Sequence, residues 1–226
     1  MKKLYVIHGW TYTVEPWQKT IEILKSEYKI DVEMLNVPGL TTNSKKEWTI
    51  EEYRDWADRN IPKDSVALGH SNGGRILLNL CSEKPDKLKR LILLDAAGVY
   101  EESKKREVSR KLSKMFGFLK KSALLRKIFH KLVGASDYDR APENMKKTLA
   151  NMLSSDKKLD ISKVKTPTTI LWGEKDTVTP LRQGEKMHEQ IEGSELLTYK
   201  NWTHAPYIVD PSGLARAINK VMEGIE

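Results

Sequence analysis

Cysteine is almost absent from this sequence, since Cys81 is the single thiol among 226 residues. A lone cysteine excludes an internal disulfide and is typical of proteins in reducing compartments. Long apolar runs are missing too, because no stretch approaches the roughly 20 apolar residues that a membrane-spanning helix needs. The apolar stretch near the start, Leu4 to Ile7, is too short for the core of a signal peptide. We therefore expect a cytoplasmic protein.

Motifs for metals and nucleotides are also missing. No group of His, Cys and carboxylate residues has the spacing of metal ligands, and neither GxxxxGK[ST] nor GxGxxG occurs. We therefore expect a protein that uses no metal and no cofactor.

Short apolar strand patterns alternate with helical patterns along most of the chain. The strand patterns, rich in β-branched and aromatic residues, lie at about 3–9, 30–39, 65–71, 88–98, 166–176 and 194–201. Between them apolar residues recur at helical spacing, and Thr49 with Glu52 forms a capping-box sequence before one helix. This alternation predicts an α/β fold, a three-layer sandwich whose six-stranded, mostly parallel sheet carries helices on both faces.

The net charge of +8 is concentrated in one segment. Residues 98–160 contain 16 Lys and Arg against 8 Asp and Glu, whereas the rest of the chain has 23 of each. Apolar residues spaced by threes and fours between these cations predict basic amphipathic helices. The residues of this apolar stripe are Val108, Leu112, Met115, Phe116, Leu119, Leu124, Leu125, Ile128, Phe129 and Leu132.

Chemistry-bearing residues follow several strands, at the edge where parallel sheets bind ligands. HGW follows the first strand, GHSNGG the third, GEKD the fifth, and NWTHAP the last. These motifs supply a serine, an acid and a histidine in that order: Ser71, Asp176 and His204. We expect the three side chains to meet at one edge of the sheet.

From Leu4 to about Asp210, outside the basic segment, the sequence resembles the α/β-hydrolase fold superfamily. HGW resembles the oxyanion loop of that family, GHSNGG contains its GxSxG nucleophile elbow, and GEKD and HAP resemble its acid and histidine loops. The resemblance implies that Ser71 is the nucleophile, His204 the base and Asp176 the acid that orients the histidine. It also implies an oxyanion hole made by the backbone N–H groups of Trp10 and Asn72.

The assignments have alternatives within the same sequence. Ser71 is also a suitable N-cap for the helix that follows it. Asp95, at the end of the fourth strand where some family members carry their acid, and Glu174 compete with Asp176. The other candidates are expected to serve the fold or the surface: His8 and His70 as structural hydrogen-bonding residues, His130 and His188 as surface groups, and Cys81 as a buried apolar residue.

The resemblance divides the chain into an α/β-hydrolase core at 1–97 and 161–226 and a helical basic lid at 98–160, inserted after the fourth strand. A lid with an apolar stripe would close a pocket above Ser71 and favour a substrate with a substantial acyl or alkyl part. Its cations either keep the lid soluble or make a weak contact with an anionic membrane surface. No nucleic-acid partner is expected, because no groove-reading motif accompanies the charge. The chain is expected to be a monomer or a homodimer.

The sequence predicts a serine hydrolase, in particular a carboxylesterase that cleaves small to medium esters through a Ser-His-Asp triad and an acyl-enzyme. The same residues are compatible with C–C bond, thioester or amide hydrolysis and with acyl transfer. A ligand receptor of this fold that does not turn over its ligand is the alternative from another class.

Overall fold

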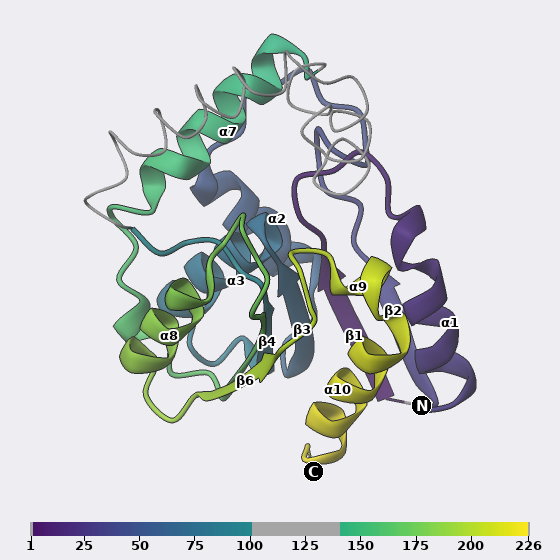
Figure 1. Ribbon diagram of the computed structural model, residues 1–226. Coiled ribbons are helices and arrows are strands. Elements are labelled where there is room, and N and C mark those ends of the chain that lie inside the picture. Colours follow the sequence, from purple (N-terminus) through teal and green to yellow (C-terminus); the bar gives the residue numbers. More distant parts are fainter. Residues whose placement is uncertain (1, 101–140, 226) are drawn as a thin grey trace, which may run out of the picture.

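The computed structural model describes residues 2–100 and 141–225 of the chain. Its centre is one parallel sheet of six strands in the order β2-β1-β3-β4-β5-β6 (Figure 1). The six-stranded sheet predicted from the sequence is therefore confirmed. The strands are β1 (Lys2–Ile7), β2 (Ile30–Met34), β3 (Ser65–His70), β4 (Leu88–Leu94), β5 (Thr168–Gly173) and β6 (Glu195–Tyr199).

Helices cover both faces of this sheet because successive strand side chains point to opposite sides. In β1, Tyr5 and Ile7 enter one apolar core, while Leu4 and Val6 enter the other. The first core is covered by α2 (Ile50–Asn60), α3 (Asn72–Glu83) and α8 (Leu181–Gln190), and the second by α1 (Gln18–Ser26) and α10 (Pro211–Glu223) (Figure 1). The shorter elements are η1 (Glu15–Trp17), η2 (Ile161–Lys163) and α9 (Pro206–Val209).

The capping box predicted for α2 is present. Thr49 Oγ1 accepts from the Glu52 N–H at 3.3 Å, and a carboxylate oxygen of Glu52 accepts from the Thr49 N–H at 2.9 Å. These two bonds satisfy donors that the helix itself leaves without acceptors.

The strand order reverses direction between β1 and β3, the two strands that precede the HGW and GHSNGG motifs. From β1 the chain moves outward to β2, and it then returns past β1 to form β3 on the other side. At such a switch point the loops that follow the two strands diverge and leave a crevice. The loops after β1 and β3, which carry HGW and GHSNGG, are the two that leave the sheet at this point.

Of the predicted lid, residues 98–160, the structure describes 98–100 and 141–160. The amphipathic helices predicted within 101–140 lie outside the described residues. Its described helix, α7 (Glu143–Ser155), lies beyond the carboxyl ends of the strands (Figure 1). The Trp48 N–H donates to Thr148 Oγ1 at 2.9 Å, and Asn151 Nδ2 donates to the Trp48 carbonyl at 3.3 Å. These bonds attach α7 to the loop before α2.

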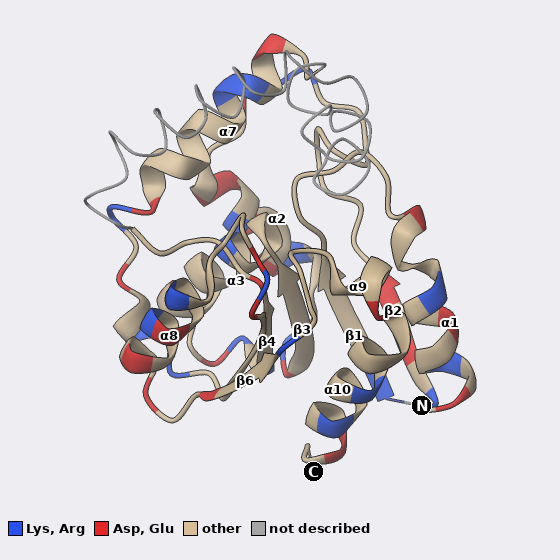
Figure 2. Cartoon of the chain, viewed as in Figure 1, with Lys and Arg blue, Asp and Glu red and all other residues tan. Residues whose placement is uncertain are grey.

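Charges of both signs lie together on α1, α7 and α8 (Figure 2). Residues 101–140 carry 12 Lys and Arg against 5 Asp and Glu, so most of the net positive charge belongs to that part of the sequence. Within residues 2–100 and 141–225, no helix is both long enough and apolar enough to cross a membrane.

A buried carboxyl group links the ends of two central strands. Asp95 follows β4 and is fully buried, and its Oδ1 accepts from the Gly173 N–H at the end of β5 at 2.8 Å. Burial raises the pKa of this carboxyl well above its ordinary value, and the negative charge of Asp176 raises it further. The hydrogen bond from Gly173 opposes this increase without cancelling it.

Asp95→Asn should therefore stabilise the protein increasingly as the pH rises. Because the folded-state pKa of Asp95 is raised, its favourable contribution is complete below about pH 3.9 and declines as the pH rises toward the folded-state pKa. Asparagine keeps an acceptor for Gly173 and does not ionise. The difference in melting temperature between Asp95→Asn and the parent should grow between about pH 4 and about pH 8.

Asp58→Asn provides a control of opposite sign, because hydrogen bonds from Lys84 and Lys87 lower the pKa of the Asp58 carboxyl. A group of this kind stabilises the fold above its unfolded-state pKa and loses that contribution as the pH falls. The loss of stability caused by Asp58→Asn should therefore increase as the pH rises. A stability difference for Asp95→Asn that stays constant or shrinks over the same range would contradict the account of Asp95.

Candidate active site

Ser71 stands at a sharp turn between β3 and α3. Its backbone has φ 51° and ψ −116°, in the left-handed half of φ/ψ space that residues with a side chain rarely occupy. The flanking glycines allow close packing, because a Cβ on Gly73 would lie 2.0 Å from the Ile7 carbonyl oxygen. A Cβ on Gly69 would likewise lie 2.6 Å from the Gly74 Cα. The start of α3 therefore packs directly on β1, and the chain turns within the length of the motif.

The hydroxyl of Ser71 points to His204 and makes no capping bond with α3. Ser71 Oγ lies 2.9 Å from His204 Nε2, and His204 Nδ1 lies 2.7 Å from Asp176 Oδ2. With the proton of the neutral imidazole on Nδ1, Nδ1–H donates to the carboxylate and Nε2 accepts from the serine. The structure thus brings the serine, histidine and acid of the sequence prediction into one hydrogen-bonded chain.

Asp176 is surrounded by donors that favour its ionised form. Its Oδ1 accepts from the Val178 N–H at 2.7 Å and the Thr179 N–H at 3.0 Å, and its Oδ2 accepts from the Thr179 hydroxyl at 2.7 Å. Burial raises the pKa of this carboxyl, but His204 and the donors of Val178 and Thr179 outweigh burial and hold the pKa below its ordinary value. A negative charge is therefore maintained beside the imidazole at neutral pH.

The two alternative acids have other partners. Asp95 Oδ1 is bound to the Gly173 N–H, and its Oδ2 has no hydrogen-bond partner among residues 2–100 and 141–225. Glu174 is exposed and accepts from the hydroxyl of Thr198 at 3.2 Å. Of the three carboxylates weighed from the sequence, Asp176 is the one in contact with His204.

The histidines of the two glycine motifs are buried and hold backbone groups of the site. His70 Nε2–H donates to the His204 carbonyl at 2.7 Å, and burial, aided by the charge of His204, lowers the pKa of His70 to about 3. His8 Nδ1–H donates to the Gly9 carbonyl at 2.8 Å, while Nε2 accepts from Thr41 Oγ1 at 3.1 Å. Burial also lowers the pKa of His8. Both rings are therefore neutral and serve the structure, as expected.

The remaining candidates lie apart from this chain. His188 is on α8 and shares a hydrogen bond of 3.0 Å with the hydroxyl of Ser194, and His130 lies outside the described residues. Cys81 is a buried free thiol whose pKa is raised to about 12 by burial. A thiol so strongly held in its protonated form is a poor nucleophile.

The residues expected to form the oxyanion hole flank Ser71. A Cβ on Gly9 would lie 3.1 Å from the Ser71 Cβ, so the loop that carries Trp10 lies against the serine. The Gly9–Trp10 peptide is planar, and the bond from His8 to the Gly9 carbonyl therefore also orients the Trp10 N–H. Asn72 is the first residue of α3, where an N–H has no acceptor within the helix.

Sequence reasoning missed a buried ion pair beside Asn72. Arg75 binds both carboxylate oxygens of Asp156, at 2.7 and 3.0 Å, and its Nη1 also donates to Asn72 Oδ1. The Asn72 amide in turn donates to Met152 Sδ of α7 at 3.2 Å. A possible signal was the arginine itself, a charge among the apolar residues that follow the elbow in α3.

Sequence reasoning also missed Thr179, whose hydroxyl contacts both Asp176 and His204. Threonine is too common in loops to attract attention by its identity. Its signal was its place, three residues after the predicted acid and next to Pro180 at the start of α8.

Comparison with known proteins agrees with this architecture. Residues 3–211 match the family model of the alpha/beta hydrolase fold. The chain is 26% identical to a pimeloyl-[acyl-carrier protein] methyl ester esterase of Neisseria meningitidis serogroup C, with all of this chain and 95% of the relative covered. It is 22% identical to YugF, an uncharacterized hydrolase of Bacillus subtilis, with 89% and 82% covered.

Solved structures share the fold at low sequence identity. A putative lipase from Acinetobacter baumannii superposes with a TM-score of 0.74 at 17% identity, covering 99% of this chain and 84% of that one. A lipase-esterase related protein from Clostridium acetobutylicum also has a TM-score of 0.74 at 17% identity, with 97% and 93% covered. Since the family model spans nearly the whole chain, the protein belongs to the α/β-hydrolase fold family.

Proposed function

We propose that the protein is a serine carboxylesterase that cleaves small to medium esters through an acyl-enzyme. The observation that carries this proposal is the hydrogen-bonded chain from Ser71 through His204 to the ionised carboxylate of Asp176. A serine hydroxyl is weakly nucleophilic at neutral pH, and a histidine held at hydrogen-bond distance can remove its proton during attack. The esterase names of several relatives support the same reaction class.

The reaction proceeds in two half-reactions. Ser71 Oγ attacks the ester carbonyl while its proton passes to His204 Nε2, and the N–H groups of Trp10 and Asn72 donate to the resulting oxyanion. The imidazolium then protonates the departing alcohol, which leaves the acyl group on Ser71. His204 next removes a proton from water, the hydroxide attacks the acyl-enzyme, and the proton returns to Ser71 as the acid leaves. Asp176 keeps the Nδ1 proton in place and stabilises the imidazolium throughout.

Ser71→Ala should abolish turnover of p-nitrophenyl esters, with a loss of kcat/KM of at least about 10³-fold, because no other group can form the acyl-enzyme. The variant should also lose covalent labelling by a fluorophosphonate, which reacts with an activated serine. The measurement is hydrolysis of an ester series graded by acyl chain length, together with mass spectrometry of the labelled chain. Cys81→Ala is the matched control and should keep both activities, because this thiol is buried and protonated.

Labelling that persists in Ser71→Ala would rule out this serine as the nucleophile. A wild-type protein that is labelled and binds esters without releasing acid would favour the alternative of a ligand receptor. Turnover of thioesters or amides in preference to esters would keep the residues and change the substrate class.

Asp176→Asn should reduce kcat by on the order of 10³- to 10⁴-fold with little effect on KM, because an amide no longer selects the Nδ1–H tautomer of His204. Asp95→Asn is the comparison, since Asp95 is the other buried carboxyl of this region and does not contact His204. It should keep kcat within about threefold of the parent. A larger loss in Asp95→Asn than in Asp176→Asn would transfer the role of the acid to Asp95.

A more specific substrate follows from the relatives, several of which are named for a methyl ester carried on an acyl-carrier protein. The charge of the chain favours such a substrate if its carrier is anionic, because residues 98–160 contain an excess of 8 cations. We therefore propose a carrier-bound acyl methyl ester as the preferred substrate within the esterase class.

Pimeloyl-[acyl-carrier protein] methyl ester should be hydrolysed with a higher kcat/KM than free dimethyl pimelate, which offers the same methyl ester without the carrier. Raising the NaCl concentration from about 50 mM to about 500 mM should erase this advantage, because salt screens attraction between exposed charges. The free diester serves as the control, and its kcat/KM should change little with salt. Equal kcat/KM for the two substrates at low salt would remove the carrier from the proposal and leave a small-molecule esterase.

A further inference from the structure

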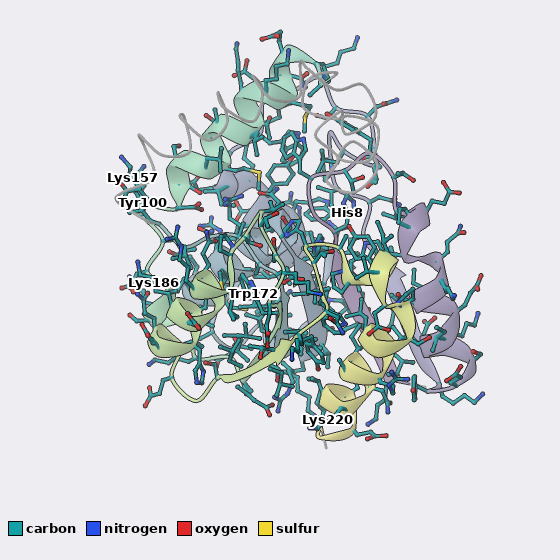
Figure 3. All side chains as sticks on the ribbon, in the orientation of Figure 1. His8, Tyr100, Lys157, Trp172, Lys186 and Lys220 are labelled. Carbon is teal, nitrogen blue, oxygen red and sulfur yellow. The ribbon has the colours of Figure 1, made fainter. Side chains whose placement is uncertain are left out.

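Thr179 is held from several sides at the end of the loop that carries Asp176. Its N–H donates to Asp176 Oδ1 at 3.0 Å, and its carbonyl accepts from the indole N–H of Trp172 at 2.9 Å. Trp172 lies inside the molecule and is fully buried (Figure 3). Only 5% of Thr179 is exposed, so neither its backbone nor its side chain is free to turn toward solvent.

The hydroxyl of Thr179 has three polar neighbours. It lies 2.7 Å from Asp176 Oδ2, 3.1 Å from His204 Nδ1 and 3.0 Å from the Asp95 carbonyl. A hydroxyl has one proton to donate, while its oxygen can accept two. The three contacts are therefore not equivalent, and the charge of each neighbour decides the direction of each bond.

The proton of Thr179 belongs on the bond to Asp176. A carboxylate is a stronger acceptor than a neutral carbonyl, and the contact with Asp176 is also the shorter of the two. With the proton so placed, a lone pair of the Thr179 oxygen faces His204 Nδ1. That nitrogen must then carry its proton, which leaves His204 Nε2 unprotonated toward Ser71.

We propose that Thr179 is a positioning residue that fixes the Asp176 carboxylate and the Nδ1–H tautomer of His204, an inference that rests on the proposed esterase function. Asp176 Oδ1 is held by two backbone N–H groups, whereas Oδ2, which receives His204, has the Thr179 hydroxyl as its second donor. Without that hydroxyl the carboxylate and the imidazole lose a shared partner at the atoms that set their alignment.

Two matched pairs of variants separate the hydroxyl from the methyl group of Thr179. Thr179→Val keeps the shape and removes the hydroxyl, and Thr179→Ser keeps the hydroxyl and removes the methyl. Thr179→Ala and Thr179→Ser both lack the methyl and differ in the hydroxyl alone. The control is Thr168→Val, which removes a buried hydroxyl bound to the Thr166 carbonyl at the other end of β5.

Thr179→Val should lower kcat by about tenfold or more, the effect of losing one hydrogen bond to a charged group, with KM unchanged within about twofold. The second-order rate of fluorophosphonate labelling should fall in parallel, because that reaction also requires an activated Ser71. Thr179→Ser should keep both rates within about threefold of the parent, and Thr168→Val should keep them unchanged. The measurements are steady-state kinetics with a p-nitrophenyl ester, labelling kinetics, and circular dichroism to establish folding.

Full kcat in Thr179→Val, or equal losses in Thr179→Val and Thr179→Ser, would overturn the proposal and leave Thr179 a packing role. If Thr179→Val does not fold, the comparison of Thr179→Ala with Thr179→Ser decides the question in the same way. A wild-type chain that neither hydrolyses esters nor reacts with the fluorophosphonate would overturn the proposed function together with this inference. Normal labelling of wild type with an unchanged rate in Thr179→Val would overturn this inference alone.

Discussion

The left-handed backbone of Ser71 is the constraint on which the rest of this site depends. A residue with a side chain in such a conformation costs about 1–3 kcal/mol, and the surrounding structure must supply that energy. The Ser71 N–H donates to the Leu94 carbonyl at 3.1 Å, and its carbonyl accepts from the Ala97 N–H at 2.9 Å. The strand next to β3 and the loop that follows it therefore hold the elbow from one side, while α3 packs on β1 from the other.

A second constraint separates the behaviour of two buried carboxyl groups. Asp176 accepts hydrogen bonds from His204, from the Val178 N–H and from both the N–H and the hydroxyl of Thr179. Within the part of the chain that the structure describes, the carboxyl of Asp95 accepts one, from Gly173. Burial opposes ionisation of both groups, and the number of donors decides the outcome. The pKa of Asp176 is lowered and that of Asp95 is raised. The ionised group is the one that lies against the imidazole.

The sheet, and the three side chains that meet at its edge, could be predicted from the sequence. Alternating strand and helix patterns carry the fold, because a strand buried on both faces must be apolar along its length. Ser71, Asp176 and His204 could be predicted because parallel strands deliver their carboxyl ends to one edge. The sequence favoured Asp176 over Asp95 through its motif, and the structure adds the physical reason, because the loop after β5 directs Asp176 to His204 whereas Asp95 binds the Gly173 N–H.

Side-chain partners across long sequence separations could not be predicted in this way. The Arg75–Asp156 pair joins residues 81 positions apart, and no local pattern indicates which acid an arginine in α3 will meet. The contacts of Thr179 depend likewise on the path of one loop, which hydrophobic periodicity does not describe. Charge and spacing located the basic segment at 98–160. They did not predict how α7 is attached to the loop before α2, because that attachment consists of hydrogen bonds from Trp48 to Thr148 and from Asn151 to Trp48.

A second attachment holds the end of α7 beside the turn that carries Ser71. Arg75 and Asp156 are both buried, and removing one partner of such a pair typically costs about 3–5 kcal/mol because the other charge remains in the interior. The pair joins the end of α7 to α3, beside the elbow, and through Asn72 it extends to Met152. Near α7, Lys157 lies 5.4 Å from the ring centroid of Tyr100, which lies in the loop after β4 (Figure 3).

The same helix also contacts the loop that follows β2. Met145 fills the space above Gly39, where a Cβ would lie 2.3 Å from its sulfur. Methionine adapts its shape readily to its neighbours, which suits Met145 to the space over Gly39 and Met152 to its contact with the Asn72 amide. The hydrogen-bonded chain of Ser71, His204 and Asp176 is built on the α/β core, whereas α7 contributes Met152 beside Asn72. The hydrogen-bonded chain and the helix that packs beside it therefore belong to separate parts of the sequence, so α7 can vary without displacing Ser71, His204 or Asp176.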